Sequence, residues 1–139
     1  MSAQENVDLV KQGYAAFNIG NIEGVLSLFA EDIEWTVPST EGVPFGGTYK
    51  GRGQVAEFFK TLATAEDILE FTQDDFIAQN DKVVVTGRSK ARVRATGHTL
   101  ETAYVHIFTV SGSKVQKFIE YFDTAAVANA YRQSAGAHA

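Results

Sequence analysis

The runs AYVHIFTV (103–110) and KVQKFIEYFD (114–123) are rich in β-branched and aromatic residues and are separated only by Ser111-Gly112-Ser113. Two such runs joined by a short turn predict a long antiparallel β-hairpin. Each run carries one ionisable residue among apolar neighbours, His106 in the first and Glu120 in the second. A strict two-residue turn would place Glu120 on the outer face of the sheet, whereas one bulge would place it inside beside His106, and we expect the bulge.

Turn signals at Asn80-Asp81 and Thr96-Gly97 extend this hairpin into a meander of strands at about 68–79, 82–95, 98–110 and 114–122. Two-residue turns would pair Gly87 with both Asp74 and His106, so that these three residues form one row across the inner face. A glycine between two ionisable residues would leave room there for a ligand.

The N-terminal half shows helical periodicity. Ser2-Ala3-Gln4-Glu5 has the form of a capping box and precedes apolar residues at three- and four-residue steps, which predicts a helix over about 3–18. Asn21 can cap a second helix over about 22–29, and a third is expected over about 53–64. Asp123 can cap a last short helix.

Between the second and third helices we expect one short strand and one loop. Ile33, Trp35 and Val37 alternate with polar residues, and Pro38 ends that strand. Residues 39–53 include five of the twelve glycines and predict a loop. This loop is either a flap over a site or a segment pinned by its aromatics Phe45 and Tyr49.

Length and composition predict one globular domain of 139 residues, ordered over about 3–132, with a disordered tail after Gln133. A net charge of −5 makes nucleic acid and anionic membranes unsuitable partners. The chain has no cysteine, which excludes disulfides and thiol catalysis. No signal peptide and no apolar run of about 20 residues is visible, so a cytoplasmic protein is expected.

Several of these segments resemble one superfamily. Phe17-Asn18-Ile19-Gly20-Asn21, the Trp35 strand ending at Pro38, the Gly51-x-Gly53 helix start and the closing Glu120-Tyr121-Phe122-Asp123 are similar to nuclear-transport-factor-2-like proteins, above all SnoaL-like and ketosteroid-isomerase-like ones. The resemblance implies an α+β fold. In that fold a cone-shaped, curved antiparallel sheet is wrapped by three helices from the N-terminal half and a short C-terminal helix.

The resemblance also carries expectations about chemistry. Ketosteroid isomerase uses an aspartate base with a tyrosine and a protonated aspartate; its base position falls on Val37 and its tyrosine position on Gly13, beside Tyr14. Steroid isomerisation by that set is therefore not expected. SnoaL-like cyclases match better, because their acid–base carboxylate lies where this chain has Glu120 and their histidine where it has His106.

These patterns predict a pocket for a small apolar ring- or carbonyl-containing molecule, with acid–base isomerase, cyclase or dehydratase chemistry. The alternatives are a non-catalytic ligand-binding or protein-association module, with His106 and Glu120 as a structural pair or Glu120 exposed. A metal site is a lesser alternative, and no metal or cofactor is expected. The predicted catalytic residues are His106, Glu120 and Asp74, and the predicted ligand-binding residues are Tyr14, Trp35, Val37, Phe45, Phe59, Gly87, Tyr104 and Phe118.

The outer face of the predicted sheet is unusually apolar. The expected register leaves Ile119 and Tyr121 outside, next to Val84, Val105 and Ile107. A patch of this size on a convex face is more than a monomer usually exposes. We therefore predict a homodimer that buries this face.

Overall fold

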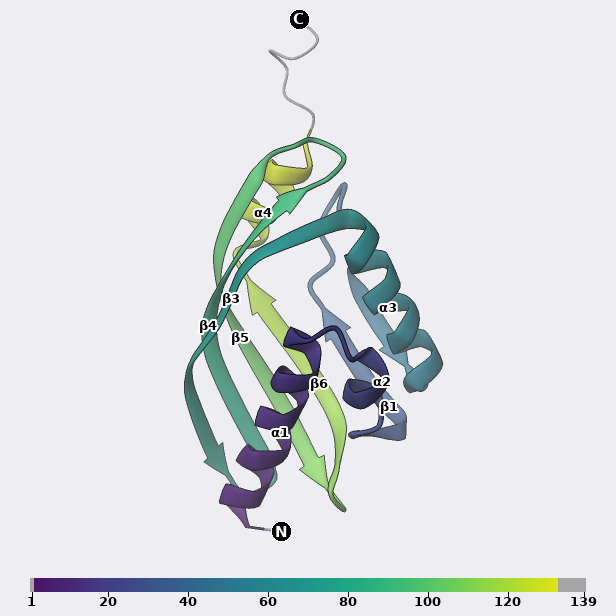
Figure 1. Cartoon of the computed structure of the whole chain (residues 1–139), viewed down its shortest axis with the longest axis vertical. Helices are drawn as coiled ribbons and strands as arrows, with labels where there is room; N and C mark the ends of the chain where they lie inside the picture. Colours follow the sequence, from purple (N-terminus) through teal and green to yellow (C-terminus); the bar gives the residue numbers. More distant parts are fainter. Residues whose placement is uncertain (1, 133–139) are drawn as a thin grey trace, which may run out of the picture.

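The computed structural model describes residues 2–132 as one curved six-stranded sheet with helices packed on its concave side (Figure 1). The strands are β1 (Phe29–Val37), β2 (Gly47–Lys50), β3 (Glu66–Gln79), β4 (Lys82–Val93), β5 (Thr99–Ser111) and β6 (Lys114–Phe122). The helices are α1 (Ala3–Asn18), α2 (Ile22–Leu26), α3 (Gly51–Ala65) and α4 (Thr124–Tyr131). The predicted α+β class is confirmed.

The strands lie in the order β2-β1-β6-β5-β4-β3. All neighbours are antiparallel except β1 and β6, which run parallel, so one pairing differs from the wholly antiparallel sheet that was expected. Helix α1 packs against β3 and β4, and α3 packs against β1 (Figure 1). Helix α4 closes the other end of the concave side against β5.

Local sequence signals set both ends of α1 and the start of α4 as predicted, whereas α2 ends at Leu26 and not near residue 29. The Ser2 side chain accepts a hydrogen bond from the Glu5 backbone, and the Glu5 carboxylate accepts one from the Ser2 backbone, which completes the capping box. Gly20 follows α1 with a φ of 76°, a left-handed value that favours glycine. The Asp123 side chain caps α4 by accepting from the Ala126 backbone.

Two predictions between α2 and α3 were wrong. Strand β1 begins at Phe29 instead of Ile33, because the neighbouring Leu28 carbonyl accepts from the Val115 backbone of β6 and the chain is already extended there. Residues 39–53 are not all loop, since they include β2, in which Tyr49 pairs with Trp35. The loop is pinned by its aromatics: Phe45 is buried, and the Tyr49 hydroxyl donates to the Phe45 carbonyl at 2.7 Å.

Two β-bulges decide which side chains point inward. The β5–β6 hairpin has the predicted bulge, so that Glu120 pairs with His106 on the inner face. On β3 the predicted pairing of Phe76 with Val85 is confirmed, but an unpredicted bulge follows between Gln73 and Asp75. This bulge removes Asp74 from the inner row, which corrects the prediction that Asp74 lies opposite Gly87.

The β4–β5 register differs by two residues from the predicted one. Gly87 pairs with Tyr104, and His106 pairs with Val85, because the connection spans residues 94–98 instead of a two-residue turn. A shift of two residues keeps every side chain on its predicted face but changes its neighbours. The predicted row of Asp74, Gly87 and His106 therefore does not form.

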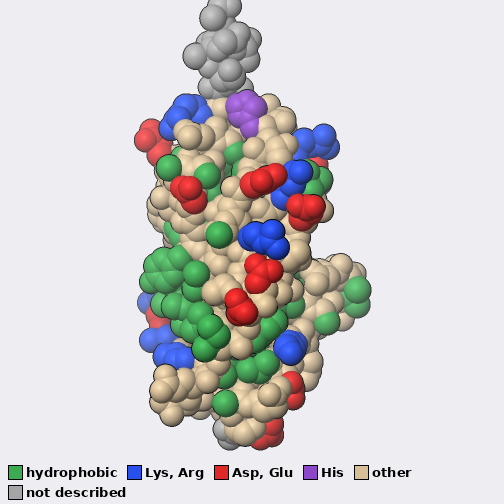
Figure 2. Space-filling view, turned by 90° about the vertical axis from the view of Figure 1, so that its left-hand side faces the viewer, with side chains coloured by type: hydrophobic (Ala, Val, Ile, Leu, Met, Phe, Trp, Pro, Cys, Tyr) green, Lys and Arg blue, Asp and Glu red, His purple; other side chains and the backbone are tan. Residues whose placement is uncertain are grey.

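An apolar row crosses the convex face of the sheet. Ile77 pairs with Val84, Val84 with Ile107, and Ile107 with Ile119, so the row spans four strands. Tyr121 lies next to this row and is 55% exposed. Figure 2 shows hydrophobic side chains gathered on this side of the molecule, with charged side chains around them. Within residues 2–132, no helix combines the length and the apolar character needed to cross a membrane.

Candidate active site

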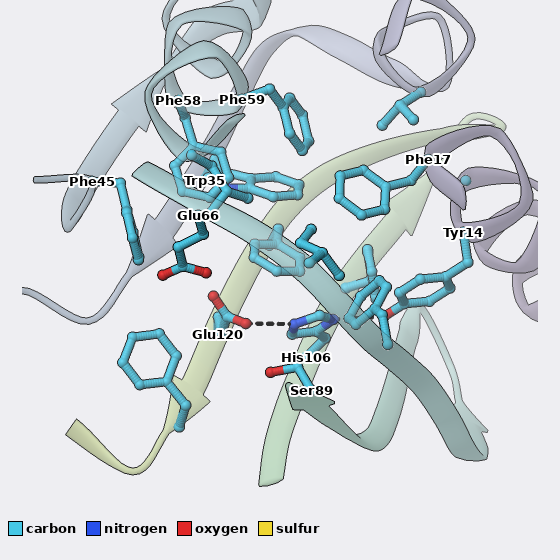
Figure 3. A pocket seen from close by; sticks show the side chains of 18 of the residues that line it. Tyr14, Phe17, Trp35, Phe45, Phe58, Phe59, Glu66, Ser89, His106 and Glu120 are labelled. Atoms are coloured by element: carbon cyan, nitrogen blue, oxygen red, sulfur yellow. Dashed lines mark hydrogen bonds and ion pairs between the residues drawn. The ribbon is translucent and has the colours of Figure 1, made fainter. Parts of the chain in front are cut away.

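Three polar side chains from α1, β5 and β6 form one hydrogen-bonded chain. The Nδ1 atom of His106 lies 2.6 Å from the Tyr14 hydroxyl, and its Nε2 atom lies 2.8 Å from Oε2 of Glu120 (Figure 3). His106 is 5% exposed, while the Glu120 side chain retains 19% exposure. Both ring nitrogens of the buried imidazole therefore have a hydrogen-bond partner. Of the two residues, Glu120 is the more accessible to solvent.

The chemistry of the two partners determines how His106 is protonated. An ionised carboxylate can only accept, so with Glu120 ionised the Nε2 atom donates to it. Burial, more than the nearby Tyr104 and Glu120, raises the pKa of Tyr14 far above its usual value, so that the phenol keeps its proton. Tyr14 then donates to Nδ1, and a neutral imidazole satisfies both contacts.

Tyr104 supports the imidazole from the side. Its ring stacks on His106 with centroids 4.2 Å apart, and its hydroxyl donates to the Thr72 carbonyl at 2.7 Å. Burial raises the pKa of Tyr104 to about 12. A Cβ atom added at Gly87 would overlap both the Thr72 carbonyl oxygen and the Tyr104 hydroxyl. Gly87 thus makes room for this hydrogen bond and not for a ligand, which corrects its predicted role.

A mostly apolar cavity of about 150 Å³ opens beside Glu120 and His106. Ligand sites are usually about 300 Å³ or larger, and a cavity of about 150 Å³ accommodates one benzene-sized ring. Trp35 on its wall stacks on Phe118 with centroids 3.7 Å apart. The Trp35 Nε1 atom is buried without a hydrogen-bond partner among residues 2–132, so it is a free donor next to the cavity.

Glu66 adds a second carboxyl group to this cavity. It is the first residue of β3, and the Tyr131 hydroxyl of α4 donates to its Oε2 atom at 2.5 Å. Burial raises the pKa of Glu66, the Tyr131 hydrogen bond lowers it in part, and the charge on Glu120 raises it further. Figure 3 shows the Glu66 and Glu120 carboxyl groups pointing toward one another.

The structure brings many of the predicted site residues together. The cavity wall includes Tyr14, Trp35, Phe45, Phe59, His106, Phe118 and Glu120. Val37, Gly87 and Tyr104 do not line it: Val37 is buried in the core, and Tyr104 lies behind the cavity wall, against Phe71 and His106.

Asp74 is not part of the site. Its carboxylate pairs with Arg88 at 3.3 Å and its side chain is 44% exposed, away from His106. The prediction of a catalytic Asp74 is therefore wrong, and the bulge before Asp75 is the reason. Among residues 2–132 no group of three or more His, Cys, Asp or Glu side chains is placed to hold a metal ion.

Glu66 and Tyr131 carry no sequence signal that marks them as site residues. Glu66 lies at the junction of α3 and β3, where no periodicity shows which way its side chain points. Its partner Tyr131 is 65 residues away in the chain, so no local pattern links the two. The role of Tyr14 was also underestimated, since it was expected to line the pocket and not to bind His106.

The sequence of residues 10–118 matches the SnoaL-like domain family. The chain belongs to the SnoaL-like family. Its fold is shared with an NTF2-like protein from Burkholderia xenovorans LB400, which is 38% identical over 95% of this chain and 99% of that one, with a TM-score of 0.87. The superfamily that the sequence resembles is therefore confirmed.

Two further proteins are similar to this SnoaL-like chain over most of its length. TerC, whose crystal structure was obtained by co-crystallization with polyporic acid, is 31% identical over 91% of this chain and 98% of its own, with a TM-score of 0.82. An uncharacterised protein of Mycobacterium tuberculosis is 25% identical over 123 residues, which are 88% of this chain and 92% of that protein.

Proposed function

We propose that this SnoaL-like protein binds a small ring-containing carbonyl compound and carries out acid–base chemistry on it, with Glu120 as the base. The observation that carries the proposal is the position of Glu120. One of its oxygens is held by the buried His106, and the other has no hydrogen-bond partner among residues 2–132 and lies at the apolar cavity. A carboxylate fixed in this way can take a proton from a bound molecule.

His106 and Tyr14 act through Glu120. The Nε2–H group fixes the carboxylate, and Tyr14 in turn fixes the imidazole by its hydrogen bond to Nδ1. When Glu120 has taken a proton, the Nε2–H group still holds the carboxyl group in place, so that Glu120 can return the proton to the bound molecule. Isomerisation, cyclisation and dehydration all require such reversible proton transfer next to a carbonyl group.

The walls of the cavity indicate the kind of ligand. They are aromatic and aliphatic except for a few polar atoms, including the unpaired Nε1 of Trp35, which could donate to a ligand oxygen. TerC was co-crystallized with polyporic acid, and we propose this compound as a first binding probe for the present chain. A ligand larger than one ring would have to displace side chains of the wall, because the cavity is about 150 Å³.

Deuterium exchange tests the proposal. A panel of one- and two-ring ketones in D2O, followed by NMR, is expected to exchange its α-protons faster with the wild-type protein than with Glu120→Gln, by about 10²-fold or more. Glu70→Gln, on the exposed side of β3, is the matched control and should leave the rate unchanged. If no ketone exchanges faster with the wild type than with Glu120→Gln, Glu120 is not a base for such compounds.

A binding measurement separates the catalytic function from the alternative of a binding module. Trp35 is the only tryptophan and lies on the cavity wall, so quenching of its fluorescence by polyporic acid reports occupancy. Binding without proton exchange on any ketone would favour the module.

We propose in addition that the convex face is the interface of a homodimer. The apolar row from Ile77 to Ile119 and the exposed Tyr121 support this, because such rows are normally covered. The cytoplasmic location predicted from the sequence stays a prediction.

A further inference from the structure

Glu66 and Glu120 lie on different strands of the sheet and face the same cavity. Glu66 begins β3 and Glu120 lies near the end of β6, and their carboxyl groups point toward one another (Figure 3). Each has one polar partner on its far side, Tyr131 for Glu66 and His106 for Glu120. A ligand between the two strands would therefore meet a carboxyl group on both sides.

We infer that Glu66 is a second catalytic residue, which donates a proton to the substrate oxygen while Glu120 removes a proton from carbon. We also infer that Tyr131 is its positioning residue. This inference rests on the proposed function, because it assigns Glu66 a part in the chemistry of the same cavity.

The two carboxyl groups have different partners, and this decides which of them is the acid. His106 donates an N–H group to Glu120, and an ionised carboxylate is a strong acceptor for such a donor. Glu66 receives only the neutral Tyr131 hydroxyl. Two like charges facing each other in an apolar site are unfavourable, so one proton is retained. The raised pKa of Glu66, caused first by burial, agrees with its being the protonated member.

Other charged groups nearby do not change this assignment. Among residues 2–132, Tyr131 and Glu120 are the titratable groups that interact with Glu66. Lys90, which also lines the cavity, pairs with Glu101 at 3.6 Å, and the adjacent Arg92 and Arg94 both pair with Asp67, at 3.5 Å and 2.7 Å. Tyr131 donates to one oxygen of Glu66, so the other oxygen can carry the acid proton toward the cavity.

The reaction step balances without a co-reactant. The Glu120 carboxylate takes a proton from the carbon next to a carbonyl group, and the C–H electron pair forms a C=C bond. The carbonyl π electrons move to oxygen, which takes the proton of Glu66 and gives an enol. Glu120 then returns its proton to another carbon of a conjugated system, and the enol returns its hydroxyl proton to Glu66. The class of substrate is therefore an enolisable, conjugated cyclic carbonyl compound.

A carboxyl titration tests the inference without any substrate. The 13C signals of the glutamate side chains are followed by NMR against pH, and Glu66→Gln assigns the Glu66 signal. We expect Glu66 to titrate above the usual glutamate value of about 4.5. Its midpoint should fall in Glu120→Gln, because the like charge is gone, and rise in Tyr131→Phe, because the donated hydrogen bond is gone. A Glu66 midpoint at or below about 4.5, or one that does not change in Glu120→Gln, overturns the inference.

Ketone exchange separates this inference from the proposed function. We expect Glu66→Gln to slow the α-proton exchange by about 10²-fold, since the amide keeps the hydrogen bond to Tyr131 but cannot transfer a proton. If Glu66→Gln exchanges protons at the wild-type rate while Glu120→Gln is inactive, the role of Glu66 is overturned. The proposed function with Glu120 as the base is then still supported. Unchanged rates in both variants overturn both.

Discussion

At the residue scale, the site depends on a chain of contacts between distant positions. Tyr14 and His106 are 92 residues apart in the sequence, whereas His106 and Glu120 are 14 apart. The nearer pair could be expected from the hairpin pattern, but the contact to Tyr14 arises only when α1 packs on the sheet. A buried imidazole needs both partners, because an unpaired polar atom in the interior costs about 1–3 kcal/mol.

Tyr14→Phe is expected to lower the free energy of unfolding by about 1–3 kcal/mol, since it leaves Nδ1 of His106 without its partner. Urea denaturation followed by circular dichroism measures this change. Tyr121→Phe, at an exposed position, is the control and should change the free energy by less than about 0.5 kcal/mol. Equal effects of the two substitutions would show that the Tyr14 hydroxyl does not stabilise His106.

Gly87→Ala is expected to destabilise the protein by at least about 2 kcal/mol, because the new Cβ atom overlaps the Thr72 carbonyl oxygen and the Tyr104 hydroxyl. Gly53→Ala in the first turn of α3 is the matched control, where a Cβ atom meets nothing within 4 Å. That change should stabilise by about 0.5 kcal/mol. Thermal unfolding of the two variants side by side gives the comparison, and a tolerated alanine at position 87 would argue against the tight approach of Tyr104.

At the element scale, most boundaries followed from local signals. The capping residues of α1 and α4 predicted where those helices begin, and the turns at 80–81 and 112–113 were predicted as observed, whereas the connection 94–98 is longer than the predicted turn. Strand β2 could not be predicted in the same way, because four residues between glycines become a strand only by pairing with β1. The bulge at Asp74 left no local signal, so the wrong placement of Asp74 came from an assumed regular register.

Burial of the Glu66 carboxyl group makes the stability of the fold depend on pH. The pKa of Glu66 is raised in the folded protein, so its protonated form contributes stability that is complete below the unfolded value of about 4.5. That contribution is lost as the pH rises through the folded pKa, because the folded state then holds the proton more tightly than the unfolded state. The substitution Glu66→Gln removes the titrating group, so the variant does not lose this stability as the pH rises.

We therefore expect the free energy of unfolding of Glu66→Gln, relative to wild type, to increase between about pH 4.5 and neutral pH. Urea denaturation at a series of pH values measures the difference between the two proteins. Glu70→Gln, which changes an exposed carboxyl on the same strand, should give a difference that does not vary with pH in the same way. If the free energy of unfolding of Glu66→Gln relative to wild type stays constant or falls over this pH range, burial of the ionised Glu66 does not destabilise the folded state.

At the scale of the whole molecule, the alternation of apolar residues along β4, β5 and β6 was enough to predict which side chains lie on the concave face and which lie on the convex face. Even the two-residue error between β4 and β5 kept each side chain on its predicted side. The concave face and its mostly apolar lining were therefore predictable, whereas the size of the cavity was not. That size depends on how far Phe45, Trp35 and Phe118 fill the concave side, which is a matter of packing between distant segments.

The convex face of the sheet is expected to join two copies of the chain. We expect analytical ultracentrifugation to show a dimer at micromolar concentration, because Ile77, Val84, Ile107 and Ile119 form a continuous apolar row that water would otherwise cover. Ile107→Glu places a charge in the middle of this row and should shift the protein to monomer. Thr99→Glu lies on the same strand and the same face but outside the row, so its dimer should persist. A wild-type protein that is monomeric at this concentration, or a dimer that tolerates glutamate at position 107, would show that the convex face does not join two copies of the chain.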